Sequence, residues 1–153
     1  MRVIVAAVGR PRNAALAAAI DFYETRAAGY WPLEVREVRE EPARSATAAQ
    51  VQEREGERLA ARVEGAELVV CDERGDSMTS AGFARFLQEA RERARDVAFV
   101  IGGAYGLAPA LRRRAVRRLA LAPWTLPHEM ARLVLAEQLY RAGTIVRGEP
   151  YHK

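Results

Sequence analysis

Three segments of the sequence each follow an apolar run and carry residues that could bind a small molecule. They are the charged residues after ELVVCD at 67–72, the glycine-rich loop GGAYGLA at 102–108, and the apolar loop APWTLP at 122–127. In sheets of parallel strands, ligands bind outside the carboxyl ends of the strands. These three segments are therefore the first places to look for a binding site.

The glycine-rich loop contains Gly102, Gly103 and Gly106, which would let backbone amides approach a ligand closely. Its spacing is neither G-x-G-x-x-G nor that of a P-loop, because no Gly-Lys-Ser or Gly-Lys-Thr follows. The loop therefore gives no support to a dinucleotide-binding protein or an ATPase. The alternative interpretation is that these glycines serve only a tight turn that needs positive φ.

The loop APWTLP is unusually apolar, and its two prolines fix φ on either side of Trp124 and Thr125. A segment of this kind either packs into the core or forms a wall whose backbone groups face a flat, partly apolar ligand such as adenine. Both interpretations stay open, and simple packing is the commoner outcome.

Other residues that often carry chemistry are few. The chain has one cysteine, Cys71, and two histidines, His128 and His152. This set excludes an internal disulfide and a zinc-like ligand set, so we expect no metal. Cys71 lies in an apolar run without a nearby base, which is typical of a small hydrophobic residue rather than a nucleophile. His128 is expected to cap or pack at the start of a helix.

Basic charge is concentrated near the carboxyl end of the chain. Residues 1–100 carry 15 arginines and 17 acidic residues, whereas residues 101–153 carry 8 arginines, 1 lysine and 3 glutamates. Such an excess predicts contact with a polyanion such as nucleic acid. The tail Tyr151-His152-Lys153 could stack on a base and contact a phosphate, or it could be a disordered chain end. A genome-driven preference for arginine would explain the same composition without any partner.

The hydrophobic pattern indicates which elements position these segments. It predicts strands at 2–8, 33–38, 67–72, 97–101 and 118–121, and helices at 13–26, 47–63, 81–93, 110–116 and 129–142. A turn at 73–76 is expected to end the third strand, and Gly143 is expected to end the last helix. The alternation predicts an α/β sandwich with a mainly parallel sheet, and the alternating charges of LEVREVRE place that strand near an edge.

Length and composition favour a single domain over residues 1–153. The chain has 153 residues, of which 50% are hydrophobic and 29% charged, the profile of a globular protein. Its longest apolar stretch, at 14–20, is far shorter than the about 20 residues that a membrane helix needs. A cytoplasmic location is therefore expected.

Taken together, the motifs resemble one family. The segments VIVAAVGR, VVCDERGD, IGGAYGL, TLPHEMARLVLAEQLYRA and RGEPYHK, in order along the whole chain, resemble the RlmH family of SPOUT-class pseudouridine N(3)-methyltransferases of large-subunit ribosomal RNA. The resemblance implies an α/β fold with a C-terminal trefoil knot, which is an exception to the rule that chains avoid threading. It also implies a homodimer.

The resemblance further implies that S-adenosylmethionine binds in the knot. The matching positions are Cys71, Gly103, Ala122, Pro123, Trp124, Thr125, Leu126 and Pro127. Relatives more commonly carry leucine where Cys71 stands, and a cysteine keeps an apolar wall there. We therefore expect cofactor binding to tolerate this difference.

The activity implied is methylation of N(3) of a pseudouridine in large-subunit (23S-type) rRNA, on the assembled ribosome. We expect His152 or a nearby tail group to handle the N(3) proton and Tyr151 to stack on or orient the base. Arg141 and Arg132 are expected to contact the RNA backbone, and Arg141 is expected, with His152 and Tyr151, to form the catalytic group. Because no separate RNA-binding domain is evident, the partner subunit is expected to complete the substrate pocket.

Two alternatives remain at this point. One is a non-catalytic ribosome- or RNA-binding α/β protein, in which the glycine loop and APWTLP are only structural. The other is a SPOUT methyltransferase that acts on tRNA, which would leave the tail unexplained. A Rossmann-type methyltransferase is disfavoured, because only Gly9 follows the first strand.

Overall fold

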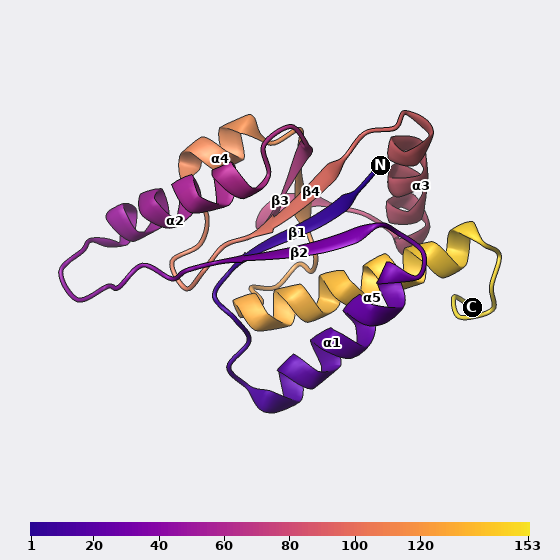
Figure 1. The fold of residues 1–153 in the computed structure, drawn as a ribbon, viewed down its shortest axis with the longest axis horizontal. Helices are drawn as coiled ribbons and strands as arrows, with labels where there is room; N and C mark the ends of the chain where they lie inside the picture. The colour runs from indigo at the N-terminus through magenta and orange to yellow at the C-terminus, as the bar shows by residue number, and fades with distance from the viewer.

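Five parallel strands form a single sheet, in the order β2-β1-β4-β3-β5 (Figure 1). The structure is a computed structural model that describes all of residues 1–153. The strands are β1 (Val3–Val8), β2 (Leu33–Val38), β3 (Glu67–Ser77), β4 (Val97–Ile101) and β5 (Arg117–Ala120). The helices are α1 (Ala14–Ala28), α2 (Ala48–Arg62), α3 (Ser80–Glu92), α4 (Pro109–Arg114) and α5 (His128–Val146). The predicted alternation, the parallel sheet and the edge position of residues 33–38 are confirmed. The implied trefoil knot stays a prediction.

Helices cover both faces of the sheet, because successive side chains of a strand point to opposite faces. Val3, Val5 and Ala7 of β1 pack in one apolar cluster with residues of α1, α3 and α5. The alternate residues of β1 pack in a second cluster with α2 and α4. Figure 1 shows α2 and α4 above the strands and α1 and α5 below them. No helix has the length and apolar character that crossing a membrane requires.

Local side chains set the start of three helices. Asn13, Thr47 and Thr79 each accept a hydrogen bond from the backbone N–H three residues ahead, which satisfies a donor that the helix itself leaves free. Thr47 and Gln50 form the predicted capping box, in which each side chain also bonds to the other residue's backbone. The predicted start of each of these helices is therefore close to the observed one.

The bulge in β3 corrects one prediction, since residues 73–76 do not end the strand in a turn. Cys71 and Asp76 both pair with Leu119 of β5, so the residues between them leave the ladder and β3 then resumes. Gly75 permits this close approach, because a Cβ there would lie 2.5 Å from the backbone of Arg118. The bulge holds residues 72–75 at the end of the sheet that carries the other loops of interest.

The end of α5 corrects a second prediction, because Gly143 lies inside the helix. Tyr30 covers this position so closely that a Cβ on Gly143 would lie 2.3 Å from Tyr30 Cγ. The helix ends instead at Val146, and Gly148, two residues later, has φ +68°. Its N–H donates to Ile145 C=O, and the next N–H, of Glu149, donates to Thr144 C=O, the pairing that commonly ends a helix at a glycine.

Candidate functional site

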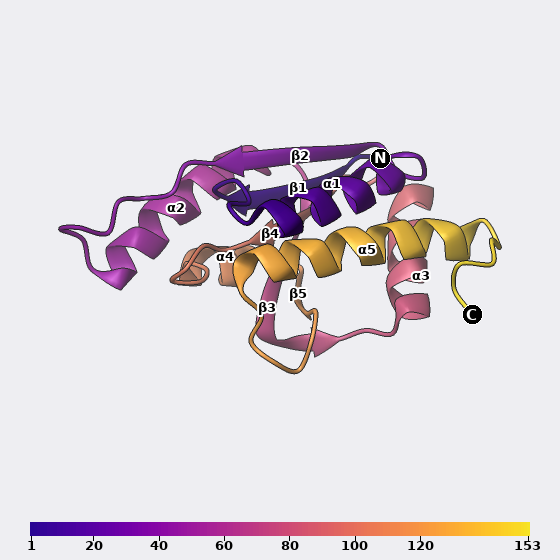
Figure 2. The same ribbon diagram turned by 90° about the horizontal axis from the view of Figure 1, so that it is seen from below.

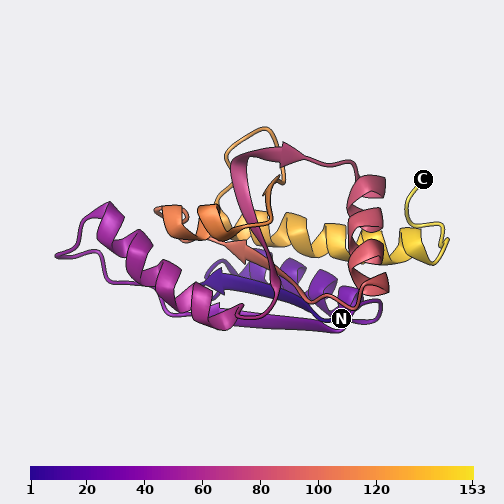
Figure 3. The ribbon, with the colours of Figure 1, turned by 90° about the horizontal axis from the view of Figure 1, so that it is seen from above.

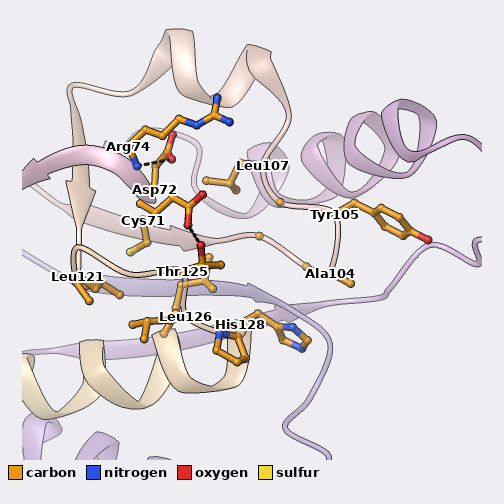
Figure 4. A pocket seen from close by; sticks show the side chains of 18 of the residues that line it. Cys71, Asp72, Arg74, Ala104, Tyr105, Leu107, Leu121, Thr125, Leu126 and His128 are labelled. Atoms are coloured by element: carbon orange, nitrogen blue, oxygen red, sulfur yellow. Dashed lines mark hydrogen bonds between the residues drawn. The ribbon is translucent and has the colours of Figure 1, made fainter.

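A cavity of about 680 Å³ lies at the carboxyl ends of β3, β4 and β5. It is lined by the β3 bulge (71–74), the glycine loop (101–107) and the loop at 121–128, together with single residues of α2, α4 and α5. Figure 4 shows Cys71, Leu121, Thr125 and Leu126 around the same space, with His128 beside them. The three segments singled out in the sequence are therefore brought together. Among the expected cofactor-binding residues, only Pro123 does not line the cavity.

The glycine loop turns so tightly that its glycines are required. A Cβ on Gly102 would lie 2.7 Å from the carbonyl carbon of Gly106, and Gly106 itself has φ +79°. Gly106 N–H donates to the carbonyl of Gly103 at 3.0 Å, which closes the turn. The same turn leaves loop backbone along the cavity wall. The tight-turn interpretation and the binding interpretation are thus compatible.

Helix α2 holds the glycine loop from behind. Gln52 Nε2 donates to the carbonyl of Tyr105 at 2.5 Å, and a Cβ on Gly103 would lie 2.9 Å from Glu55 Oε1. Glu55 is only 4% exposed, and this burial raises its pKa. Sequence reasoning missed these contacts because the helix is rich in charge. The available signal was Gly56, because glycine is unfavourable inside a helix and indicates close packing there. A Cβ on Gly56 would indeed lie 2.8 Å from Cβ of Ala108.

The loop at 121–128 forms a wall and does not pack into the core. Thr125 Oγ1 donates to Glu73 Oε2, which ties the loop to the β3 bulge. Trp124 is 77% exposed at the cavity, whereas Leu126 is half-buried. Pro127 then precedes the first residue of α5, His128. The packing alternative for this apolar segment is therefore wrong.

Cys71 contributes an apolar wall and no reactive thiolate. Its surroundings desolvate the thiol and raise the pKa of Cys71 to about 12, although the residue keeps some exposed surface on the cavity. At neutral pH the thiol therefore stays protonated. This agrees with the interpretation of Cys71 as a small hydrophobic residue.

The neighbouring carboxylate, Asp72, is engaged in holding the bulge. Its Oδ1 accepts from the backbone N–H of Arg74 at 3.1 Å, and its Oδ2 lies 3.0 Å from Nε of Arg112. The Asp72 side chain is 3% exposed, so this ion pair joins the bulge to α4 away from solvent. No group of three or more His, Cys, Asp or Glu side chains is placed to hold a metal ion.

The three expected catalytic residues lie together at the other end of α5, around Glu137. Glu137 Oε1 accepts from Arg141 Nη2 at 2.6 Å and from the Tyr151 hydroxyl at 3.1 Å. Arg141 Nη1 lies 3.3 Å from His152 Nδ1, and its guanidinium lies 4.7 Å from the centre of the Tyr151 ring. We refer to these four residues as the tail cluster. The tail therefore folds back onto α5.

The tail cluster depends on Glu137, which sequence reasoning missed. The i, i+4 spacing of Glu137 and Arg141 was the available signal, since such pairs face each other on a helix. Hydrogen bonding to Glu137 raises the pKa of Arg141. Burial, followed by hydrogen bonds with Tyr23 and Glu137, raises the pKa of Tyr151. Both side chains therefore keep their protons through the neutral range.

The cavity and the tail cluster are far apart within one copy of the chain. Ala131 is the last residue of α5 that lines the cavity, and Arg141 lies ten residues further along the helix, which corresponds to about 15 Å along its axis. Figures 2 and 3 show the carboxyl terminus at the opposite end of α5 from the loop that enters it. The structure brings the expected cofactor residues together and the expected catalytic residues together, but not the two groups.

Arg132 overturns one expectation, because it is not available to contact RNA. It is 7% exposed, and its Nε and Nη1 donate to Glu24 and Glu37, each at 2.8 Å. Burial alone would lower its pKa, but these two carboxylates raise the pKa of Arg132. Arg132 therefore joins α5 to α1 and β2 inside the protein.

Comparison with curated proteins gives relatives of the same length. The chain is 67% identical over 154 residues to "Ribosomal RNA large subunit methyltransferase H" of Gemmatimonas aurantiaca, with all of both chains covered. It is 51% identical to the protein of the same name from Anaeromyxobacter dehalogenans, again with all of both chains covered.

Solved structures and a family model complete the comparison. A probable methyltransferase from Bordetella pertussis has a TM-score of 0.56 at 14% identity, over 92% of this chain and 95% of that chain. The tRNA (m1G37) methyltransferase from Aquifex aeolicus has a TM-score of 0.56 at 7% identity, over 100% of this chain and 74% of that chain. At these identities the structures support the fold alone. Residues 1–152 match the family model described as "Predicted SPOUT methyltransferase", and the chain therefore belongs to the SPOUT methyltransferase family.

Proposed function

We propose that this methyltransferase transfers a methyl group from S-adenosylmethionine to N(3) of a pseudouridine in large-subunit rRNA, on the assembled ribosome in the cytoplasm. One observation carries the proposal. The loops that the family resemblance assigns to the cofactor surround one cavity, in a chain whose full-length relatives are named for large-subunit rRNA methylation.

The cavity fits the proposed cofactor in size and in chemistry. Its volume of about 680 Å³ is within the range of small-molecule sites. Cys71, Ala122, Trp124 and Leu126 supply apolar surface for a flat base, and the glycine loop supplies backbone groups for polar edges. We propose Cys71, Gly103 and residues 122–127 as the cofactor-binding residues. When bound, S-adenosylmethionine supplies a sulfonium methyl group, whose transfer requires no metal.

The tail cluster would act on the target base. N(3) must lose its proton to attack the methyl carbon, so a group beside it must accept that proton or stabilise the resulting anion. With Arg141 donating to Nδ1 of His152, the neutral ring carries its hydrogen on Nε2. It can then donate to a carbonyl oxygen next to N(3), and it can accept the proton at Nδ1 once Arg141 turns away. Tyr151 would stack on or orient the base.

A second copy of the chain would bring the two parts together. Within one copy, Arg141 lies about 15 Å along α5 from Ala131, the last residue of the helix that lines the cavity, so one base cannot contact both Arg141 and the cavity. In a two-fold dimer with the α5 helices antiparallel, the tail of one copy would reach the cavity of the other. We therefore propose a homodimer whose active site contains residues of both subunits.

Mixing two inactive variants tests the whole proposal. Gly103→Val should abolish cofactor binding, and His152→Ala should abolish proton handling on ribosomes that lack the modification. If the site is shared, the mixed dimer contains one intact site, and random pairing should restore about a quarter of the wild-type rate. No recovery after subunit exchange, which mass spectrometry can verify, would show that each subunit works alone.

Two measurements address the alternatives. A non-catalytic protein would not bind S-adenosylhomocysteine, the demethylated product, up to millimolar concentration in calorimetry. A tRNA enzyme would methylate tRNA in preference to ribosomes with the same labelled cofactor. The ordered tail cluster favours the ribosomal proposal, because it gives the tail a built structure that the tRNA alternative does not use.

A further inference from the structure

Four arginines surround the outer edge of the edge strand β5. All four are exposed, and none is in an ion pair: Arg113, Arg114, Arg117 and Arg118. We call them the α4–β5 arginine patch. Val116, which is 63% exposed, lies between the two pairs. The patch is thus an open cationic surface with an apolar centre.

Some arginines elsewhere on the surface are neutralised by acidic residues, although others, such as Arg62 and Arg93, are not. Arg2 pairs with Asp96 at 2.7 Å and Arg12 pairs with Glu40 at 2.5 Å. The patch itself forms no ion pair, and residues 97–128, which include it, contain no acidic residue. On β3, Asp72 is occupied by Arg112 and Glu73 by the hydroxyl of Thr125. Asp76, which pairs with Leu119 in the ladder, is exposed and forms no ion pair with the patch.

Local structure does not require four cations here. Arg113 and Arg114 lie in the last turn of α4, where positive charge is favourable, but Arg117 and Arg118 begin a strand. Charged side chains can protect an edge strand from pairing with other chains. The opposite edge strand, β2, carries side chains of both charges, since its Arg36 forms an ion pair with Glu34. Edge protection therefore does not explain a patch of one sign.

The patch adjoins the cavity. Arg112, the residue before Arg113, lines it, and Leu119, the residue after Arg118, pairs with the cavity residue Cys71. Successive strand residues point to opposite faces, and Arg117 lies over the ring of Phe86 on α3. The cations consequently surround the strand edge next to the site, where an extended polyanion could contact several of them at once.

Resting on the proposed function, we infer that the α4–β5 arginine patch binds the phosphate backbone of the rRNA substrate outside the target base. Arginine suits this role because its planar fork matches phosphate oxygens. Such contacts give affinity and register without reading sequence. Arg112, which is paired with Asp72, and Arg132, which is buried between Glu24 and Glu37, are not part of this surface.

The test is a variant with all four arginines changed to glutamine. Its KM for ribosomal particles should rise at least about tenfold at physiological salt, with kcat changed less than about twofold. The slope of log KM against log salt concentration should fall by about three, because each lost phosphate contact removes about 0.7. Affinity for S-adenosylhomocysteine and sedimentation as a dimer should not change.

A matched pair controls for net charge. Arg117→Gln/Arg118→Gln should raise KM, whereas Arg62→Gln/Arg93→Gln should not. Arg62 and Arg93 are also exposed and in no ion pair, but they lie where α2 and α3 end, beside the amino ends of the strands. An equal rise in KM for both pairs would mean that net charge, and not the α4–β5 arginine patch, determines binding, and it would overturn the inference.

Two further outcomes separate this proposal from the one it rests on. If the four-glutamine variant lost its dimer but bound ribosomal particles with unchanged affinity, the patch would be a protein interface and the inference would be wrong. If the wild type bound ribosomal particles with a salt slope that the variant reduced, but methylated nothing, the patch would stand and the proposed function would fail.

Discussion

The cavity and the tail cluster are built in opposite ways. The cavity uses backbone and small or apolar side chains, and the acid beside it, Asp72, is turned inward to an ion pair. The tail cluster uses charged and aromatic side chains held by one carboxylate, Glu137. A site of the first kind selects by shape, and a site of the second kind acts by charge and proton transfer. Substitutions in the two regions should therefore affect different steps.

The largest effect should come from filling the cavity wall. Gly103→Val places its first added carbon 2.9 Å from Glu55 Oε1 and 3.2 Å from Val8 Cγ1, so Glu55 or the glycine loop must move, and the two further methyl groups add bulk beside the cavity. Affinity for S-adenosylhomocysteine should fall at least about a hundredfold, equivalent to about 3 kcal/mol, as measured by calorimetry. The melting temperature shows whether the variant is folded. Wild-type affinity in a folded variant would remove Gly103 from the cofactor site.

The next effect concerns turnover alone. His152→Ala should lower kcat on unmodified ribosomes by about 10²- to 10⁴-fold, the usual contribution of a positioned acid or base. Binding of S-adenosylhomocysteine should stay unchanged, since the cavity lies far from His152 in the same chain. Unchanged turnover would remove His152 from the mechanism and leave Arg141 as the group that stabilises the anion.

A smaller effect should appear in substrate affinity. Tyr151→Ala should weaken ribosome binding by roughly tenfold, because stacking on a base contributes about 1–3 kcal/mol. Tyr151→Phe keeps the ring but loses the hydrogen bond to Glu137, so it should retain most of the affinity. Equal KM values for the wild type and Tyr151→Ala would argue against stacking.

The smallest effect should be a pH-dependent change in stability beneath the glycine loop. Burial raises the pKa of Glu55 above its ordinary value of 4.5, so the folded protein holds this proton more tightly than the unfolded chain. Its contribution to stability is full below the ordinary pKa and is lost as pH rises through the folded pKa. Glu55→Gln should therefore gain melting temperature relative to the wild type as pH increases from 5 to 8. A difference independent of pH would contradict this account.

Much of this fold could be predicted because its signals are local. Apolar runs, capping residues and loop glycines are read from neighbouring positions, and the parallel sheet then places the loops after β3, β4 and β5 at one end. The same rule predicts that the three loops lining the cavity lie close together, without any knowledge of their side-chain contacts. The sequence alone also identifies the arginine-rich segment at 112–118, but it does not show which of these arginines form ion pairs.

The predictions that were wrong depended on partners far away in sequence. Gly143 looks like a helix stop, but Tyr30 covers it and the helix continues. The residues at 73–76 look like a turn, but pairing with β5 returns them to the strand. Arg132 looks like a solvent-facing cation, yet it contacts Glu24 of α1 and Glu37 of β2. None of these partners leaves a periodic signal.

The strand order also has a consequence for how the protein is made. β1 is an interior strand of the sheet, between β2 and β4, and Val3 of β1 faces Val97 of β4. At a synthesis rate of about 5–20 residues per second, the ribosome needs about 5–20 s to make the chain between them. Throughout that interval the apolar segment VIVAAV has an unpaired edge, which is an aggregation hazard. A newly made copy should therefore need chaperone protection before it can act on any ribosome.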